Sequence, residues 1–181
     1  MRIRYNSPVI LTFALLCSVV FFIELFTGMG LMRFFILQDK VVLSNPLSMA
    51  TLVTHAMGHA NVEHLMGNLA FILLLGPIVE EKYGSRQMLI MILVTALITG
   101  ILNVLLFNTG LLGASGVVFM LIILASFTNT RGKEIPLTFI LVALLFLGKE
   151  IIQSFKTDQI SQFAHIIGGI CGSVFGFKQK S

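Results

Sequence analysis

Long apolar stretches recur along almost the whole of this 181-residue chain, and they constrain its fold more than any other feature. A helix needs about 20 consecutive apolar residues to cross the hydrocarbon core of a bilayer. Hydrophobic residues make up 56% of the sequence and charged residues only 11%, whereas soluble domains average about 25% charged residues. We therefore expect a single transmembrane domain over residues 1–181, with no separate soluble domain.

Six apolar runs are expected to form the helices of an all-α membrane protein with six transmembrane helices. These runs are Val9 to Phe26, Glu63 to Val79, Met88 to Phe107, Ser115 to Phe127, Ile135 to Ile152 and Gln162 to Phe177. The connection from Thr27 to Asn61 is the one long gap between runs, and its mixed composition predicts a long outer loop at the membrane surface, between helices 1 and 2.

The fourth run is too short to cross a bilayer as a helix. Its residues, about 13 in number, would cover roughly 20 Å of a hydrocarbon core about 30 Å thick. We therefore expect the chain to enter the membrane as a loop through Gly110 to Ala114, which places Ser115 about 10 Å below the outer surface. Irregular backbone at that depth needs surrounding protein or a water-filled cavity.

The basic residues stand singly or in pairs at the ends of apolar runs, so the net charge of +4 indicates membrane topology and no nucleic-acid partner. A cytoplasmic N-terminus would put eight basic residues inside and four outside, which predicts a multi-pass protein with both termini in the cytoplasm. The inner set is Arg2, Arg4, Lys82, Arg86, Arg131, Lys133, Lys178 and Lys180, and the outer set is Arg33, Lys40, Lys149 and Lys156.

Two local features complete this topology. The first run follows Arg2 and Arg4 but has no small-residue cleavage site after it, so we expect a retained helix and not a signal peptide. Cys17 and Cys171 both lie inside apolar runs, and we expect no disulfide between them.

Polar side chains inside a bilayer are costly and therefore indicate function. His64 and Asn68 are four residues apart, so they share one helical face and can both donate hydrogen bonds toward one oxyanion. Ser115 lies between Gly113 and Gly116 at an expected loop-to-helix junction, where small neighbours allow a tight turn and the close approach of a substrate carbonyl.

A serine hydroxyl needs a base before it can act as a nucleophile, and His165 at the start of the sixth run is the candidate. Small residues repeat every fourth position beside it, at Ala164, Gly168, Gly172 and Gly176. Such a ridge permits close helix packing in membranes, and Gly116 offers a matching small surface on the fourth run. Packing along this ridge would place the imidazole near Ser115.

At these residues the sequence resembles the rhomboid family of intramembrane serine proteases, over roughly Thr51 to Gly176. The motifs that carry the resemblance occur in order, as His64-Leu65-Met66-Gly67-Asn68, Gly113-Ala114-Ser115-Gly116 and Ala164-His165-Ile166-Ile167-Gly168 followed by Gly172. The stretch from Gly76 through Glu80 to Gly84 is similar to the family's Gly-xxx-Glu-xxx-Gly segment.

The resemblance implies a Ser-His dyad, with Ser115 as nucleophile and His165 as general base. It further implies an oxyanion hole formed by His64, Asn68 and the Ser115 N–H group, and no metal or organic cofactor. The supporting residues are Gly113, Gly116, His59, Gly168 and Phe119. The implied substrates are single-span membrane proteins, cut near the outer end of their helix after local unwinding, and the implied location is a bacterial inner membrane. The resemblance says nothing of the oligomeric state.

Two departures from the family pattern concern groups outside the dyad. Many members carry a Trp-Arg pair before the second helix, where this chain reads Met49-Ala50-Thr51-Leu52, so the anchoring of that loop is open. Many bacterial members place a Tyr four residues after the serine, and here Phe119 can stack on the histidine but cannot hydrogen-bond.

Other interpretations of the same residues remain. Ser115 alone could be a serine that packs helices and bonds back to a carbonyl. His55, His59 and His64 could suggest zinc, but no His-Glu-x-x-His occurs, and hydrogen bonding of the loop to the site explains His55 and His59. A catalytically inactive relative that binds or escorts membrane helices is the principal alternative to an enzyme. A transporter would require paired charges at mid-membrane or an inverted repeat, and the sequence has neither.

Overall fold

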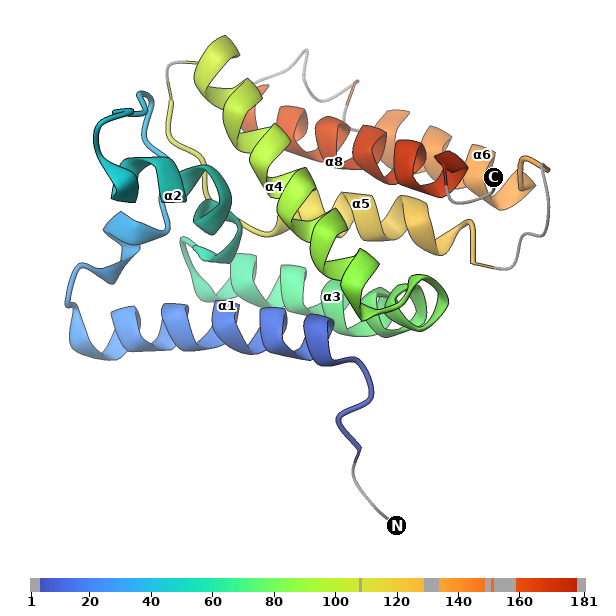
Figure 1. The fold of residues 1–181 in the computed structure, drawn as a ribbon, viewed down its shortest axis with the longest axis horizontal. Helices are drawn as coiled ribbons and strands as arrows, with labels where there is room; N and C mark the ends of the chain where they lie inside the picture. Colours follow the sequence, from blue (N-terminus) through green and yellow to red (C-terminus); the bar gives the residue numbers. More distant parts are fainter. Residues whose placement is uncertain (1–3, 108, 129–133, 149–150, 152–158, 179–181) are drawn as a thin grey trace.

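The computed structural model describes residues 4–107, 109–128, 134–148, 151 and 159–178, and these residues form an all-helical protein (Figure 1). The helices along the chain are α1 (Pro8–Thr27), η1 (Leu31–Phe34), α2 (Pro46–Thr54), η2 (His55–Met57), α3 (Val62–Tyr83), α4 (Ser85–Leu106), α5 (Ser115–Ala125), α6 (Leu137–Val142), η3 (Ala143–Leu147) and α8 (Gln159–Lys178). The short helices η1 and η2 are 3₁₀ turns, and η3 continues α6 as a π-helix. The expected all-α class is confirmed.

Three of these helices are long and apolar enough to cross a membrane, namely α1, α3 and α4. Two shorter apolar helices are α5 and the continuous segment Leu137–Leu147. With 11 residues, α5 rises about 16 Å and is too short to cross a bilayer by itself, as expected. Half of the basic residues used for the topology prediction lie outside the described residues: Arg2, Arg131, Lys133, Lys149, Lys156 and Lys180.

The boundary between α3 and α4 differs from the prediction. The sequence predicted an end at Val79 and a new start at Met88, but α3 continues to Tyr83 and α4 begins at Ser85. The apolar run ends at Val79, yet the charged residues Glu80, Glu81 and Lys82 that follow it remain helical. The chain turns at Gly84, whose φ of 82° is a conformation that favours glycine.

The predicted loop from Thr27 to Asn61 contains a helix that the sequence analysis did not expect. Asn45 caps the start of α2 by accepting hydrogen bonds from the N–H groups of Leu47 and Ser48, and Pro46 occupies the first helical position. An Asn-Pro pair is a typical helix start, so this signal was present in the sequence.

The charged side chain of Glu80 holds the start of α1 against the end of α3. Its carboxylate is buried and accepts hydrogen bonds from the N–H groups of Val9 (3.1 Å) and Ile10 (2.9 Å) and from the Ser85 hydroxyl (2.7 Å). The first N–H groups of a helix have no partner within the helix, and a negative charge there also complements the helix dipole.

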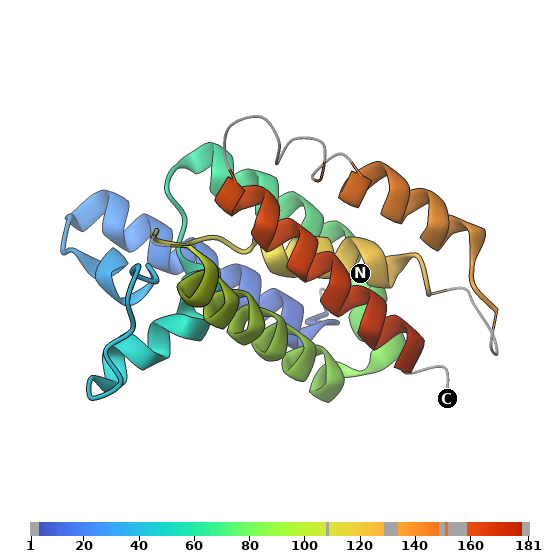
Figure 2. The same ribbon diagram turned by 90° about the horizontal axis from the view of Figure 1, so that it is seen from above.

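Helix α5 forms the centre of the molecule. It contacts α3, α4, α6 and α8, and the two views show it enclosed by these helices (Figure 1 and Figure 2). Every residue from Gly116 to Leu124 is buried, so the helix is apolar on all sides. A helix that is hydrophobic all round belongs in a protein interior.

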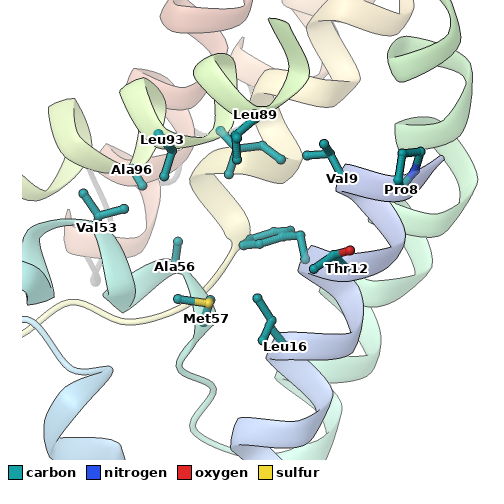
Figure 3. Close-up of a pocket in the computed structure, with 12 residues that line it drawn as sticks. Pro8, Val9, Thr12, Leu16, Val53, Ala56, Met57, Leu89, Leu93 and Ala96 are labelled. Carbon is teal, nitrogen blue, oxygen red and sulfur yellow. The ribbon is translucent and has the colours of Figure 1, made fainter. Parts of the chain in front are cut away.

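A cavity of about 410 Å³ lies between α1, η2 and α4 (Figure 3). Its walls are apolar apart from Thr12, with Leu16 on α1, Met57 on η2 and Leu93 on α4. None of the residues predicted for the functional site lines it.

Candidate active site

Ser115 is the first residue of α5 and is half-buried. The residue before it, Ala114, has no side chain that could cap the helix, and no side-chain cap is formed. The N–H of Val118 is taken by the carbonyl of Ala114 (2.9 Å). The earlier N–H groups of the first turn therefore face the site without a capping side chain, where the positive end of the helix dipole favours an anion.

The glycine ridge of α8 packs directly against α5. A Cβ atom on Gly168 would lie 2.0 Å from the carbonyl oxygen of Gly116, and one on Gly172 would lie 2.7 Å from that of Met120. The two backbones therefore touch, and the close packing predicted from the small-residue ridge is confirmed. Gly116 follows Ser115, and His165 lies about one turn before Gly168, so this contact brings the two predicted dyad residues to the same end of the helix pair.

The imidazole of His165 stacks on the ring of Phe119. The two ring centroids are 4.2 Å apart and the planes differ by 6°. Phe119 lies one turn after Ser115 on α5 and is buried, so it supplies a fixed surface on which the histidine rests. The prediction that Phe119 can stack on the histidine is confirmed.

Asn68 is buried and bonded to His59, with 3.1 Å between Asn68 Nδ2 and His59 Nε2. The other ring nitrogen of His59 is 3.2 Å from the carbonyl oxygen of Met57, which can only accept. His59 Nδ1 must therefore carry the proton, so Nε2 accepts from the Asn68 amide. Burial, together with the nearby His64, lowers the pKa of His59 to about 4, which keeps this tautomer neutral at pH 7.

His64 occupies the space beside Gly113. A Cβ atom on Gly113 would lie 2.7 Å from both Cε1 and Nε2 of His64, and the φ of Gly113 is 120°. The His64 ring also packs edge-on against His59, with centroids 5.1 Å apart, and lies near enough to His165 for an electrostatic interaction. The loop before Ser115 and the predicted oxyanion donor on α3 are therefore in direct contact.

Residues of the first loop hold the segment that leads into Ser115. Leu37 and Leu111 form an antiparallel bridge with two hydrogen bonds of 2.9 Å, and the N–H of Gly113 donates to the carbonyl of His55 (2.9 Å). The ring of His55 bonds the carbonyl of Ala96 on α4 (3.1 Å). The expectation that both loop histidines bond to the site is thus correct for the ring of His59, whereas His55 reaches the site through its backbone.

The three histidines of the zinc alternative do not form a ligand set. Both nitrogens of His59 are used in hydrogen bonds, and His55 points to α4. Within the described part of the chain, no group of three or more His, Cys, Asp or Glu side chains is arranged to hold a metal ion.

One supporting residue was missed by the sequence analysis. Lys82 donates hydrogen bonds from Nζ to the carbonyls of Phe127 (2.5 Å) and Thr128 (2.8 Å), just after the end of α5. A cation at this end complements the helix dipole and ties α3 to the helix that carries Ser115. From the sequence, the position of Lys82 at the end of an apolar run indicated only membrane topology. Its contact with the residues just after α5 could not be predicted, because the partner carbonyls lie 45 and 46 residues away in the sequence.

Comparison with known proteins agrees with this arrangement. The family model described as the Rhomboid domain matches residues 46–180, which is well over half of the chain. The chain belongs to the rhomboid family. The matched region contains all four predicted dyad and oxyanion residues of this rhomboid protein, Ser115, His165, His64 and Asn68.

Curated relatives support the same family. The Rhomboid protease GlpG of Haemophilus influenzae is 25% identical over 128 residues, which cover 69% of this chain and 67% of the relative. The Rhomboid protease GlpG of Yersinia pestis and that of Yersinia pseudotuberculosis are each 27% identical over 176 residues, which cover 94% of this chain. The alignment spans 62% of the length of these Yersinia relatives.

Proposed function

We propose that this rhomboid protein is a serine-type intramembrane endopeptidase that cleaves membrane-spanning protein substrates. The observation that carries the proposal is the contact between Gly116 and Gly168, because it joins the half-buried Ser115 at an uncapped helix start to the stacked His165. A nucleophile, a base and positively polarised N–H groups at one point are the parts that acyl transfer needs.

In this mechanism Ser115 Oγ attacks the carbonyl carbon of the scissile peptide while His165 takes the hydroxyl proton. The carbonyl oxygen becomes an oxyanion, and the Ser115 N–H, His64 and Asn68 donate hydrogen bonds to it. The C–N bond then breaks as His165 gives its proton to the leaving amine. Water, deprotonated by His165, hydrolyses the ester, releasing a carboxylate and restoring the serine.

The orientation of Asn68 supports its place in the oxyanion hole. One hydrogen of the Asn68 amide is donated to the neutral imidazole of His59, at Nε2, which fixes the orientation of the amide. The second amide hydrogen can then donate to the oxyanion. The close fit of His64 against Gly113 likewise sets the His64 ring beside the loop that enters Ser115.

The proposed setting is a bacterial inner membrane crossed six times, with both termini cytoplasmic. The apolar helices and the excess of basic residues on the inner side support this topology. The proposed substrates are single-span proteins cut near the outer end of their helix, because the short α5 would put Ser115 below the outer surface and not at mid-membrane.

Reconstitution of the purified protein with a generic single-span substrate tests this function. Ser115→Ala and His165→Ala are expected to lower the rate by about a thousandfold or more, because either change removes the dyad. Ser126→Ala is the matched control, since Ser126 lies at the other end of α5 and its hydroxyl donates to the Ile123 carbonyl in the same turn. Cleavage that survives Ser115→Ala would exclude the mechanism.

The alternative is a catalytically inactive relative that binds or escorts membrane helices. A fluorophosphonate probe separates the two, because it reacts only with an activated serine. The enzyme predicts labelling of the wild type and loss of labelling in His165→Ala. The inactive relative predicts substrate binding with no labelling of either protein.

A further inference from the structure

Helix α6 changes geometry where it continues into η3. Residues Ala143–Leu147 form a π-helix, and such segments are rare and occur often at functional sites. Leu144 and Leu145 in this segment are exposed, at 67% and 69%. The next residues, Phe146 and Leu147, are turned inward and half-buried. The wider turn therefore directs Phe146 toward the centre of the protein.

Phe146 there completes a chain of three rings from three helices. Its ring meets Phe119 of α5 edge to face, with centroids 6.2 Å apart and an interplanar angle of 80°. Phe119 in turn stacks on His165 of α8 at 4.2 Å. The edge-to-face geometry of Phe146 and Phe119 is one that aromatic pairs prefer. Phe119 is therefore contacted by His165 and by Phe146.

Two neighbouring features show what holds Phe146 and where it could move. A Cβ atom on Gly169 of α8 would lie 2.3 Å from Leu147, so η3 packs directly on α8 at the residue after Phe146. On its other side, Phe146 lines a cavity of about 420 Å³ between α3, α5 and α6. A change in the packing of η3 on α8 would therefore let the Phe146 ring leave Phe119 and enter this cavity.

We propose that Phe146 is a positioning residue, which holds Phe119 against His165 and so keeps the imidazole aligned with Ser115. The packing of η3 on α8 then sets the reactivity of the serine. A serine hydroxyl is activated only while its base is in reach, and a displacement of about 1 Å can cost about a hundredfold in rate. This role rests on the proposed protease function.

The test compares Phe146→Leu, which removes the ring, with Phe146→Tyr, which keeps it. The control is Phe139→Leu on the same helix, because Phe139 packs on Phe127 and Phe177 at the far end and does not touch the ring chain. Phe146→Leu is expected to lower kcat and the rate of fluorophosphonate labelling about tenfold with KM unchanged. Phe146→Tyr and Phe139→Leu are expected to retain the wild-type values. A role limited to substrate entry would instead change KM and leave the small probe unaffected.

A second readout does not depend on activity. Diethyl pyrocarbonate modifies exposed imidazoles, and mass spectrometry can follow its reaction with His165. Loss of the stack in Phe146→Leu is expected to speed modification of His165 relative to wild type and to Phe139→Leu. Equal labelling and equal modification rates in Phe146→Leu and wild type would overturn the proposal while leaving the protease function intact. A wild type that neither cleaves nor labels would overturn the protease function, and the modification rates would still report whether Phe146 holds the ring.

Discussion

At the scale of single residues, Gly113 shows how closely the loop before the serine fits its neighbours. Its φ of 120° is a conformation that L side chains rarely adopt, and its Cα faces the His64 ring. Glycine therefore meets two requirements at this position: it tolerates the positive φ, and it leaves room for the His64 ring.

Gly113→Ala is expected to lower activity much more than stability. The methyl group would push His64 out of the proposed oxyanion hole, and loss of one oxyanion donor costs about a hundredfold to a thousandfold in kcat. Backbone strain adds about 1–3 kcal/mol to the loss of stability. Kinetics on vesicle-reconstituted protein, together with unfolding in mixed detergent, measure the two effects.

Gly30→Ala is the matched control for backbone strain. Gly30 also has a positive φ, of 70°, but a Cβ there would meet nothing within 4 Å. It should lose stability and keep its activity per folded molecule. Similar activity losses in both variants would mean that strain alone, and not displacement of His64, explains the effect.

At the scale of elements, the pairing of α5 with α8 depends on backbone contact. Lipid tails are as apolar as leucine, so helix association in a membrane relies on van der Waals packing and interhelical hydrogen bonds. The absence of a side chain at Gly168 is what lets the Gly116 backbone approach. Helix α5 also has its end tied to α3 by Lys82.

Gly168→Ala should separate the two helices. Because its Cβ would lie 2.0 Å from a backbone oxygen, no side-chain rotation can relieve the clash, and we expect a loss of about 3 kcal/mol or more together with loss of fluorophosphonate labelling. Gly67→Ala on α3 is the control, since its Cβ would meet nothing within 4 Å, and helix propensity predicts no loss of stability. Equal stability of the two variants would contradict the importance of this contact.

At the scale of the whole molecule, two buried histidines make stability depend on pH. Burial lowers the pKa of His55 to about 4, and His59 has the same value. Above pH 6.5 both rings are neutral in the folded and unfolded states. Below pH 6.5 the unfolded state binds protons that the folded state excludes, so stability falls as the pH falls toward 4.

The free energy of unfolding should therefore decrease between pH 6.5 and about 4, by up to about 1.4 kcal/mol per pH unit for each histidine. His55→Gln keeps a nitrogen donor in reach of the Ala96 carbonyl but cannot titrate, and it should remove about half of the slope. Unfolding curves at a series of pH values measure this. A slope that is unchanged in His55→Gln would show that other groups cause the acid sensitivity.

The sequence alone determined the membrane setting, the approximate helices and the residues of the candidate site. The length of an apolar run and the spacing within a motif are local properties of the sequence. The helices could be predicted because the apolar residues that form them are contiguous in the sequence. The predicted helix boundary was wrong after Val79, where charged residues stay helical. Helix α2 was not predicted, although its Asn-Pro start is visible in the sequence.

Only the tertiary structure decided how the candidate site is held. The His59 proton faces Met57, Glu80 caps α1 from 70 residues away, and Phe146 reaches Phe119 through a π-helical turn. Any residue has a backbone carbonyl that can accept a hydrogen bond, so the residue type does not show which carbonyl a side chain will bond. The contacts of an aromatic ring depend on how helices that are distant in the sequence pack together. Such contacts therefore leave no pattern in the chain and exist only once the helices have assembled.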